Sequence, residues 1–444
     1  MKTRALVLSL AMIGAGGCSE ASNDPDNVDV ITWWNKHGEY QAMQRLIDIF
    51  ESKYPNQTVN HAPYGSSDDA RERIRDRVIA GNPPETFQAN GGWNLLSWVA
   101  YNNLDARDSK LEELDRYATW ASAMPPAVLD TVRFDGVIYG VPLNIHRLNV
   151  LFFNKQVFAD IGVPPPTTET LHTLDDLFVL CDAVKAKGRA PLALATRDSW
   201  PLAHYLFENI LVARAGGEYY RNFFRGMQAQ DILDSAQLRA SIADLSKLLS
   251  YDADARNRTW DAAVDVMRTG GAAMTIMGDW AKGYVDGKAE EEQTPVALGA
   301  IPLPGTADTF VFTTDTFSLP KGASNQDGAL KLLDLVGSKE GQDEFNLVKG
   351  SIPAREDAAI NRYDDLSKAT IAAFHAATLD PSRLVPATSV IAPPDYMTQI
   401  NELLADFAGT SGDATHADRA GNVSVVVYGL ANRADALRNS IWHY

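Results

Sequence analysis

Hydrophobic and polar positions along the chain alternate between the period of a strand and the period of a helix. Val28–Thr32 is a short, largely apolar run, which is typical of a buried β-strand. Residues 39–54 then place apolar side chains three and four positions apart, which predicts an amphipathic helix. The same succession continues with a strand at Val59–Ala62, a helix at Asp68–Ala80, a strand at Glu85–Ala89 and a helix at Trp93–Tyr101. Alternating strands and helices predict an α/β layer structure.

The unit changes near Gly136–Asn154, and a new α/β unit begins at Pro164-Pro-Pro166. The segment Phe134–Gly136 predicts a hairpin turn, and Thr173-Leu-Asp-Asp176 is a capping box that opens an amphipathic helix containing Cys181. Residues 235–250 predict another amphipathic helix, and we interpret the acidic run Glu290–Glu292 as a solvated loop. Further strands are expected at Tyr139–Pro142, Val150–Asn154 and Pro191–Ala195. A length of 444 residues predicts two or more domains.

The N-terminus carries the features of an export signal. A basic start with Lys2 and Arg4 precedes the apolar run Ala5–Ala15, which is too short to span a bilayer. Small residues then lead into Cys18, and this arrangement resembles a bacterial lipobox, in which the cysteine is acylated. Residues 1–18 are therefore predicted to be a signal with a lipobox, and residues 19–27 a flexible tether. An unmodified signal peptide cut nearby is the alternative.

Composition narrows the class of protein. The formal net charge is −17, which argues against nucleic-acid partners because these require a basic surface. No other long apolar run is present, so we expect membrane attachment only through Cys18, in the periplasm or at the cell surface. Cys181 is then left without an internal partner and is predicted to be a buried core thiol.

The candidate chemistry begins where the first predicted strand ends. Trp33 and Trp34 follow that strand directly, and Glu39 opens the next helix. A sugar ring can stack its apolar faces on indole and donate its hydroxyls to a carboxylate. Asn90 also follows a predicted strand, and ligands of α/β sheets bind beyond the carboxyl ends of strands. The alternative is that one tryptophan fills the core while the other lies on the surface.

Motifs spread along the whole chain resemble a known family. They are similar to the extracellular solute-binding proteins of ABC-type sugar importers, and more narrowly to the branch that binds glucose and related monosaccharides. The motifs are Trp33-Trp34 with Gly38-Glu39, Gly81-Asn-Pro-Pro84, Tyr139-Gly-Val-Pro142, Asn144-Ile-His-Arg-Leu-Asn149, Met277-Gly-Asp-Trp-Ala-Lys-Gly283, Phe312-Thr-Thr-Asp315, Lys349-Gly-Ser-Ile-Pro353 and Leu384-Val-Pro386.

This resemblance implies a two-lobed periplasmic-binding-protein fold with a multi-crossover hinge and a ligand cleft between the lobes. Lobe one is expected to comprise residues 28–143 and 273–318, and lobe two residues 144–272 and 319–444. Ligand binding is expected to close the lobes, and the closed monomer to dock on a membrane permease. The resemblance implies neither a cofactor nor a metal.

The resemblance also implies the site residues. Those expected to contact the sugar are Trp33, Trp34, Glu39, Asn90, Trp260, Asp315 and Lys349, and those expected nearby are His146, Trp200, Asp279 and Trp280. Glu39, Lys349 and Asp279 each have a structural alternative as helix-terminal residues. His146 has one as a hydrogen-bonding residue of the hinge. Relatives often carry a histidine after Leu384-Val-Pro386; here Thr388 or Ser389 is the candidate substitute.

Two other readings stay open at this point. One is a secreted glycosidase that uses Glu39 and Asp315, since such enzymes need two carboxylates at a fixed separation. The sequence contains no nucleophile elbow, HExxH motif, Walker A loop or Cys/His metal cluster. The other is a binder of a disaccharide. The favoured hypothesis is an importer component that binds a monosaccharide of the glucose, galactose or mannose type without transforming it.

Overall fold

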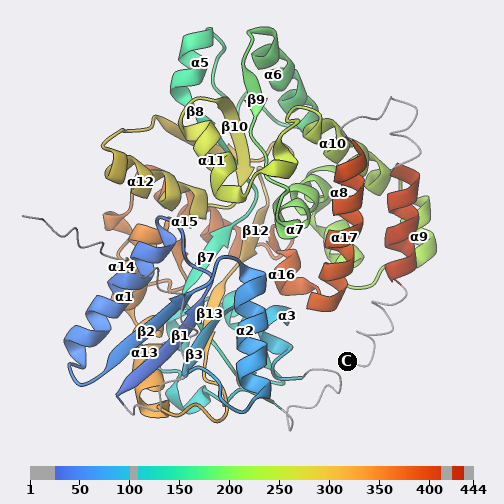
Figure 1. The fold of residues 1–444 in the computed structure, drawn as a ribbon. Helices are drawn as coiled ribbons and strands as arrows, with labels where there is room; N and C mark the ends of the chain where they lie inside the picture. The colour runs from blue at the N-terminus through green and yellow to red at the C-terminus, as the bar shows by residue number, and fades with distance from the viewer. Residues whose placement is uncertain (1–25, 101–108, 412–422, 435–444) are drawn as a thin grey trace, which may run out of the picture.

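The computed structural model describes residues 26–100, 109–411 and 423–434, and these form two lobes stacked one above the other in Figure 1. The lower lobe is built on a five-stranded sheet and the upper lobe on a four-stranded sheet. A second four-stranded sheet, which we call the hinge sheet, lies between them. The buried hydrophobic residues form one cluster for each lobe. The predicted α/β organisation is therefore confirmed.

The lower sheet has the strand order β2-β1-β3-β13-β6. Its strands are β1 (Asn27–Thr32), β2 (Thr58–Pro63), β3 (Thr86–Asn90), β6 (Val141–Pro142) and β13 (Asp315–Ser318). β1 pairs in parallel with β2 and β3, whereas β13 runs antiparallel to β3 and places Asp315 opposite Asn90. The helices of this lobe include α1 (Glu39–Lys53), α2 (Ser67–Ile79), α3 (Trp93–Leu96), α13 (Gln326–Gly337), α14 (Lys339–Lys349) and α15 (Asp365–Thr378).

The upper sheet has the strand order β11-β8-β10-β9. Its strands are β8 (Val150–Asn154), β9 (Ala190–Leu192), β10 (Ala272–Met277) and β11 (Leu298–Pro302). Its helices include α5 (Lys155–Ile161), α6 (Leu174–Ala186), α8 (Glu208–Phe224), α10 (Ala236–Leu249), α11 (Trp260–Arg268), α12 (Trp280–Glu292) and α17 (Pro394–Ser411). The predicted capping box at Thr173 opens α6, and Cys181 on that helix is free and fully buried.

The hinge sheet has the order β14-β7-β12-β15. Its strands are β7 (Asn144–Arg147), β12 (Phe310–Thr313), β14 (Ile352–Pro353) and β15 (Leu384–Pro386). Ile145 belongs to the lower core and Leu148 to the upper core, and the chain returns between Leu303 and Phe310. It crosses again at β15, where Leu384 packs below and Val385 above. The expectation that the chain crosses the hinge more than once is thus met.

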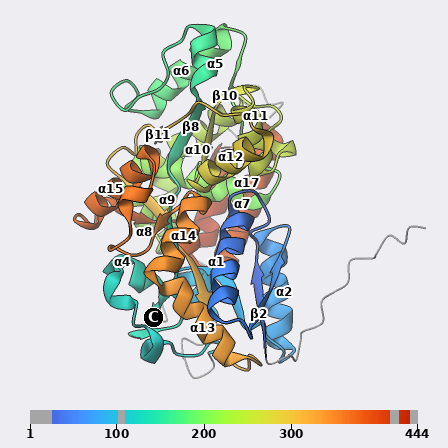
Figure 2. The same ribbon diagram turned by 90° about the vertical axis from the view of Figure 1, so that its left-hand side faces the viewer.

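The expected lobe boundaries differ from this arrangement in two stretches. β10, β11 and α12 fall within the segment expected in lobe one, yet β10 lies between β8 and β9 in the upper sheet. α13 and α14 fall within the segment expected in lobe two, yet they pack beside α1 on the lower lobe (Figure 2). The physical reason is long-range strand pairing and helix packing, which local sequence patterns do not specify.

Two local predictions also need correction. Glu290–Glu292 is the last turn of α12 rather than a loop, and Nη1 and Nη2 of Arg268 each donate to the Glu292 carboxylate at 2.7 Å. The helix expected at Trp93–Tyr101 is shorter, because α3 ends at Leu96 and is followed by turns. Tyr101 itself lies outside the described residues.

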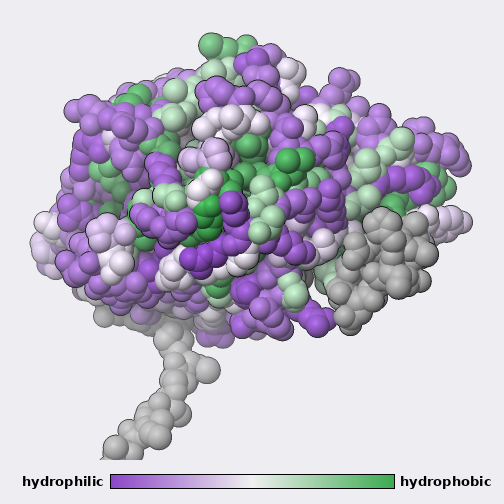
Figure 3. Space-filling model, turned by 90° about the horizontal axis from the view of Figure 1, so that it is seen from above, coloured by the Kyte–Doolittle hydropathy of each residue, from purple (hydrophilic) through white to green (hydrophobic). Residues whose placement is uncertain are grey.

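The surface is mixed. Hydrophilic residues cover most of the face seen from above in Figure 3, with some hydrophobic residues near its centre. Within the described ranges, no helix combines the length and apolar character needed to cross a membrane.

Three glycines bring the backbones of the two lobes into direct contact. Gly38 precedes α1 and Gly350 follows α14 in the lower lobe, while Gly283 lies on α12 in the upper lobe. A Cβ atom on Gly283 would lie 2.3 Å from the carbonyl oxygen of Lys349, and one on Gly350 would lie 2.5 Å from the Gly283 nitrogen. No side chain fits between these segments, and we call this arrangement the glycine contact.

The glycine contact predicts a stability cost for Gly283→Ala. The added methyl group meets backbone atoms that cannot rotate away, so we expect a loss of about 1–3 kcal/mol in the free energy of unfolding. Urea unfolding of the purified protein measures this loss. Gly65→Ala is the matched control, because the nearest atom to its Cβ would be 3.6 Å away. Equal unfolding midpoints for the two variants would contradict the prediction.

Candidate functional site

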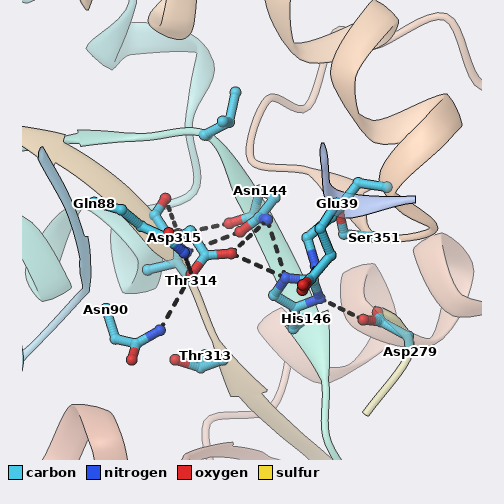
Figure 4. A network of polar contacts seen from close by, with 12 residues as sticks. Glu39, Gln88, Asn90, Asn144, His146, Asp279, Thr313, Thr314, Asp315 and Ser351 are labelled. Atoms are coloured by element: carbon cyan, nitrogen blue, oxygen red, sulfur yellow. Dashed lines mark hydrogen bonds and ion pairs between the residues drawn. The ribbon is translucent and has the colours of Figure 1, made fainter. Parts of the chain in front are cut away.

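Asp315 is the centre of a buried polar network at the start of β13 (Figure 4). Its Oδ1 accepts hydrogen bonds from Gln88 Nε2 at 3.0 Å and Asn90 Nδ2 at 3.2 Å. Its Oδ2 accepts from Asn144 Nδ2 at 2.8 Å and bonds His146 Nε2 at 3.0 Å. Only 3% of Asp315 is exposed. These four bonds use the acceptor sites of the carboxylate, which is how a buried charge is made tolerable.

His146 links this carboxylate to a second one. Its Nδ1 lies 2.5 Å from Asp279 Oδ1, and Asp279 Oδ2 accepts from the Arg147 backbone at 2.9 Å. Asp279 precedes α12 as expected for an N-cap, but its side chain does not cap that helix. Burial alone would lower the pKa of His146, yet Asp279 and Asp315 raise it above its ordinary value. Burial alone would raise the pKa of Asp315, yet His146, Lys349 and Asn144 bring it below its ordinary value.

Glu39 and Lys349 form a second buried ion pair. Glu39 is the first residue of α1 and Lys349 the last of α14, and the distance from Nζ to Oε1 is 2.9 Å. Both are buried. Burial raises the pKa of Glu39, and Lys349 offsets the shift only in part. Each residue therefore lies at a helix end, as the structural alternatives expected, and is also paired inside the protein.

The adjacent tryptophans have different surroundings. Trp34 is fully buried and packs on Phe317 and Phe345, with ring centroids 5.7 and 4.9 Å apart. It offers no ring face to a ligand in this arrangement of the lobes. Trp33 is partly exposed, and the Arg71 guanidinium lies 5.2 Å from its ring centroid. This pair matches the alternative in which one tryptophan fills the core.

The upper lobe supplies three more tryptophans. Trp280 is partly exposed and lies 5.2 Å from the His146 ring, and Trp200 lies 6.2 Å from Trp280. Trp260 is buried at the start of α11 and packs on Tyr284. The next residue, Asp261, pairs with Lys36 at 2.9 Å. The segments that carry Trp33 and Trp260 are thereby joined across the lobe boundary.

The structure joins Asn90, His146, Asp279 and Asp315 in one network and pairs Glu39 with Lys349, whereas Trp34 and Trp260 are buried in packing contacts. Gln88 shares a face of β3 with Asn90 and contacts the same carboxylate oxygen. Its two-residue spacing from Asn90 could have identified it. Sequence reasoning missed Asn144 as a site residue, although its amide both donates to Asp315 and accepts from the Asp315 backbone. Among the described residues, no group of acidic, histidine and cysteine side chains suits a metal ion.

The segment after Pro386 forms one wall of this region. Ser389 Oγ lies 3.1 Å from Thr313 Oγ1, two residues before Asp315. The neighbouring side chains Phe312 and Val390 instead line a groove of about 1040 Å³, which also contacts Trp93 and Arg221. β12 and the short helix α16 (Thr388–Ile391) therefore separate the polar network from this groove.

Thr388 is held by a buried acid. Its backbone N–H donates to Glu208 Oε2 at 2.8 Å, and its hydroxyl lies 2.7 Å from His204 Nδ1. Tyr220 Oη also donates to Glu208 Oε2, at 3.1 Å. Burial raises the pKa of Glu208 to about 8, although the bonds from Thr388 and Tyr220 oppose the shift.

This shift predicts a pH dependence of stability. When folding raises the pKa of an acid, that acid contributes most to the free energy of unfolding at pH values below its pKa in the unfolded chain. This contribution is lost as the pH rises to the pKa of the acid in the folded protein. From about pH 5 to about pH 8 the parent should lose up to ~1.4 kcal/mol per pH unit relative to Glu208→Gln. Urea unfolding across this range measures the difference, with exposed Glu290→Gln as the control. Parallel curves for the parent and Glu208→Gln would refute the prediction.

Comparison with known proteins agrees with this architecture. The model of the family described as bacterial extracellular solute-binding protein matches residues 34–343. An uncharacterised ABC transporter extracellular-binding protein of Pyrococcus horikoshii is 32% identical over 99% of both chains. A probable sugar-binding periplasmic protein of Mesorhizobium japonicum is 29% identical over 83% of this chain and 85% of its own.

Solved structures confirm the predicted two-lobed fold. The solute receptor AcbH, whose structure is described as showing an exclusive preference for β-D-galactopyranose, superposes with a TM-score of 0.76. It is 19% identical and covers 93% of this chain and 99% of its own. The matched family consists of binding proteins and not of enzymes, so the glycosidase alternative is set aside. This chain belongs to the bacterial extracellular solute-binding proteins.

Proposed function

We propose that this chain is the sugar-binding component of an ABC-type importer, and that it binds a monosaccharide of the glucose, galactose or mannose type. The observation that carries the proposal is that a buried charged network lies next to partly exposed tryptophans at the boundary between the lobes. Asp315, His146 and Asp279 form that network, and the rings of Trp280 and His146 pack perpendicular to each other. Trp33 supplies a further indole from the lower lobe.

In this proposal the ring of the sugar stacks on indole while its hydroxyls exchange for internal hydrogen bonds. The Asn90 bond to Asp315 is the longest of the four at 3.2 Å, and Asn90 is partly exposed. A sugar hydroxyl can donate to Asp315 in its place. A second hydroxyl can accept from Lys349 and donate to Glu39, which are now 2.9 Å apart. Because each sugar hydroxyl replaces an internal hydrogen-bond partner, the buried charged groups keep a partner when the sugar binds.

Contacts from both lobes would couple binding to closure, because a ligand shifts the equilibrium toward the state it binds better. Ion pairs already join the lobes in this structure, from Lys36 to Asp261 at 2.9 Å and from Lys282 to Asp364 at 2.6 Å. The closed monomer would then deliver the sugar to permease subunits. Binding of a disaccharide is the alternative, since tryptophans on both lobes suit one ring or two.

A thermal-shift screen tests the proposed ligand class. A ligand bound only by the folded protein raises its melting temperature. We expect D-glucose, D-galactose or D-mannose to raise it more than maltose or raffinose does, and the sugar to be recovered unchanged. A larger shift with a disaccharide would support the alternative, and no shift with any sugar would overturn the proposal.

Calorimetric titration of variants then tests the site. Asp315→Asn should weaken binding by about tenfold to over a hundredfold, because hydrogen bonds to charged groups contribute ~1.5–3 kcal/mol. Trp33→Ala removes a partly exposed stacking face and should weaken binding while leaving the melting temperature nearly unchanged. Cys181→Ser is the control, since that side chain lies in the core of the upper lobe. Parental affinity in both site variants would show that the sugar binds elsewhere.

We also propose that Cys18, which lies outside the described residues, is the lipidated N-terminus of the mature protein. Mass spectrometry of membrane-extracted protein should find a diacylglyceryl adduct on Cys18. Cys18→Ser should release the protein into the soluble fraction. A mature terminus downstream of Cys18, or a free thiol at that position, would rule out the anchor.

A further inference from the structure

His204 is more exposed than the three residues that follow it. It lies in η5 (Leu202–Phe207), a π-helical turn between α7 (Ser199–Pro201) and α8. Tyr205, Leu206 and Phe207 have no exposed surface, whereas His204 is partly exposed. Helical turns of this kind occur often at functional sites, because the extra residue changes the direction in which a side chain points.

Two routes of contact connect His204 to the charged network. Along the first, the Trp200 ring lies 6.3 Å from His204 and 6.2 Å from Trp280, which in turn lies 5.2 Å from His146. Along the second, Thr388 bonds His204 at 2.7 Å, and the next residue, Ser389, contacts Thr313 close to Asp315. Because both routes begin at the network and end at His204, this side chain borders the same region.

Arg71 faces this region from the lower lobe. Its Nη2 donates to Asn90 Oδ1 at 3.3 Å, and its guanidinium lies over Trp33. Burial lowers the pKa of His204 to about 3, and the nearby charge of Arg71 contributes to the shift. The imidazole is therefore neutral at working pH. Arg71 Nε is buried, and none of the described residues bonds it.

We propose that His204 is a specificity-determining residue, whose Nε2 hydrogen-bonds one hydroxyl of the bound sugar from the upper lobe. This inference rests on the proposed function. Nδ1 is occupied by Thr388, which fixes the plane of the ring, while no bond from Nε2 to another described residue is present. Thr388 is itself fixed by Glu208. A neutral imidazole nitrogen suits a hydroxyl, because a hydroxyl can either donate or accept.

The test compares the best-binding hexose from the thermal-shift screen with its 2-, 3-, 4- and 6-deoxy analogues. Calorimetric titration of the parent should show a loss of affinity for each analogue that lacks a contacted hydroxyl. We call the ratio of the affinity for the parent sugar to that for a deoxy analogue the penalty of that analogue. In His204→Phe, the penalty should fall by about three- to tenfold for one analogue, the one that lacks the hydroxyl bound by His204. The other penalties should persist. Thr388→Val should reduce the same penalty in part, because the ring is no longer held.

His172→Phe is the matched control, since His172 is exposed just before α6 and should leave all four penalties unchanged. A second measurement avoids any folding defect of the variants: in ¹⁵N-histidine-labelled parent, the His204 Nε2 resonance should shift on saturation with the sugar. An unchanged pattern of penalties in folded His204→Phe, or an unmoved Nε2 resonance, overturns this inference alone. Failure of the parent to bind any sugar overturns the proposed function together with it.

Discussion

The buried chain of charges from Asp279 through His146 to Asp315 connects every layer of the molecule. Asp279 precedes an upper-lobe helix, His146 lies on a hinge strand and Asp315 begins a lower-lobe strand. A cation between two carboxylates is tolerable inside a protein only while all three partners remain in register. These two contacts therefore help to hold the lower sheet, the hinge and α12 in position, together with the glycine contact and the ion pairs between the lobes.

Beside this chain of charges, adjacent residues of the same segment face opposite surroundings, one polar and one apolar. Thr313 and Ser389 contact each other beside the charges, whereas their neighbours Phe312 and Val390 line the apolar groove behind. Glu208 holds the end of this wall through Thr388, at the cost of a buried carboxyl with a raised pKa. Beside the wall and the charged chain, Trp33, Trp200 and Trp280 are the partly exposed tryptophans of the region.

Sequence patterns predicted the local elements well and the long-range arrangement poorly. The period of the apolar residues located β1, α1 and β8, and the capping box located α6. The membership of Glu39 and Lys349 in the site came only from family resemblance, and their pairing across 310 positions was not predicted, because no local pattern encodes it. The same limit explains why α13 and α14 were expected in the other lobe. Which of two adjacent tryptophans is buried was left open, since strand alternation stops where both residues lie.

The lone thiol in the upper core has a consequence for a protein that works outside the reducing cytosol. Cys181 is fully buried, and burial raises its pKa well above the usual range, so the reactive thiolate is scarce. While the lobe is intact, the sulfur is hidden from oxidants and from other chains. When the upper core opens, the thiol becomes accessible, and two such thiols form a disulfide only if an external oxidant takes up two electrons and two protons. A dimer linked through Cys181 therefore requires that the upper core has opened in both copies.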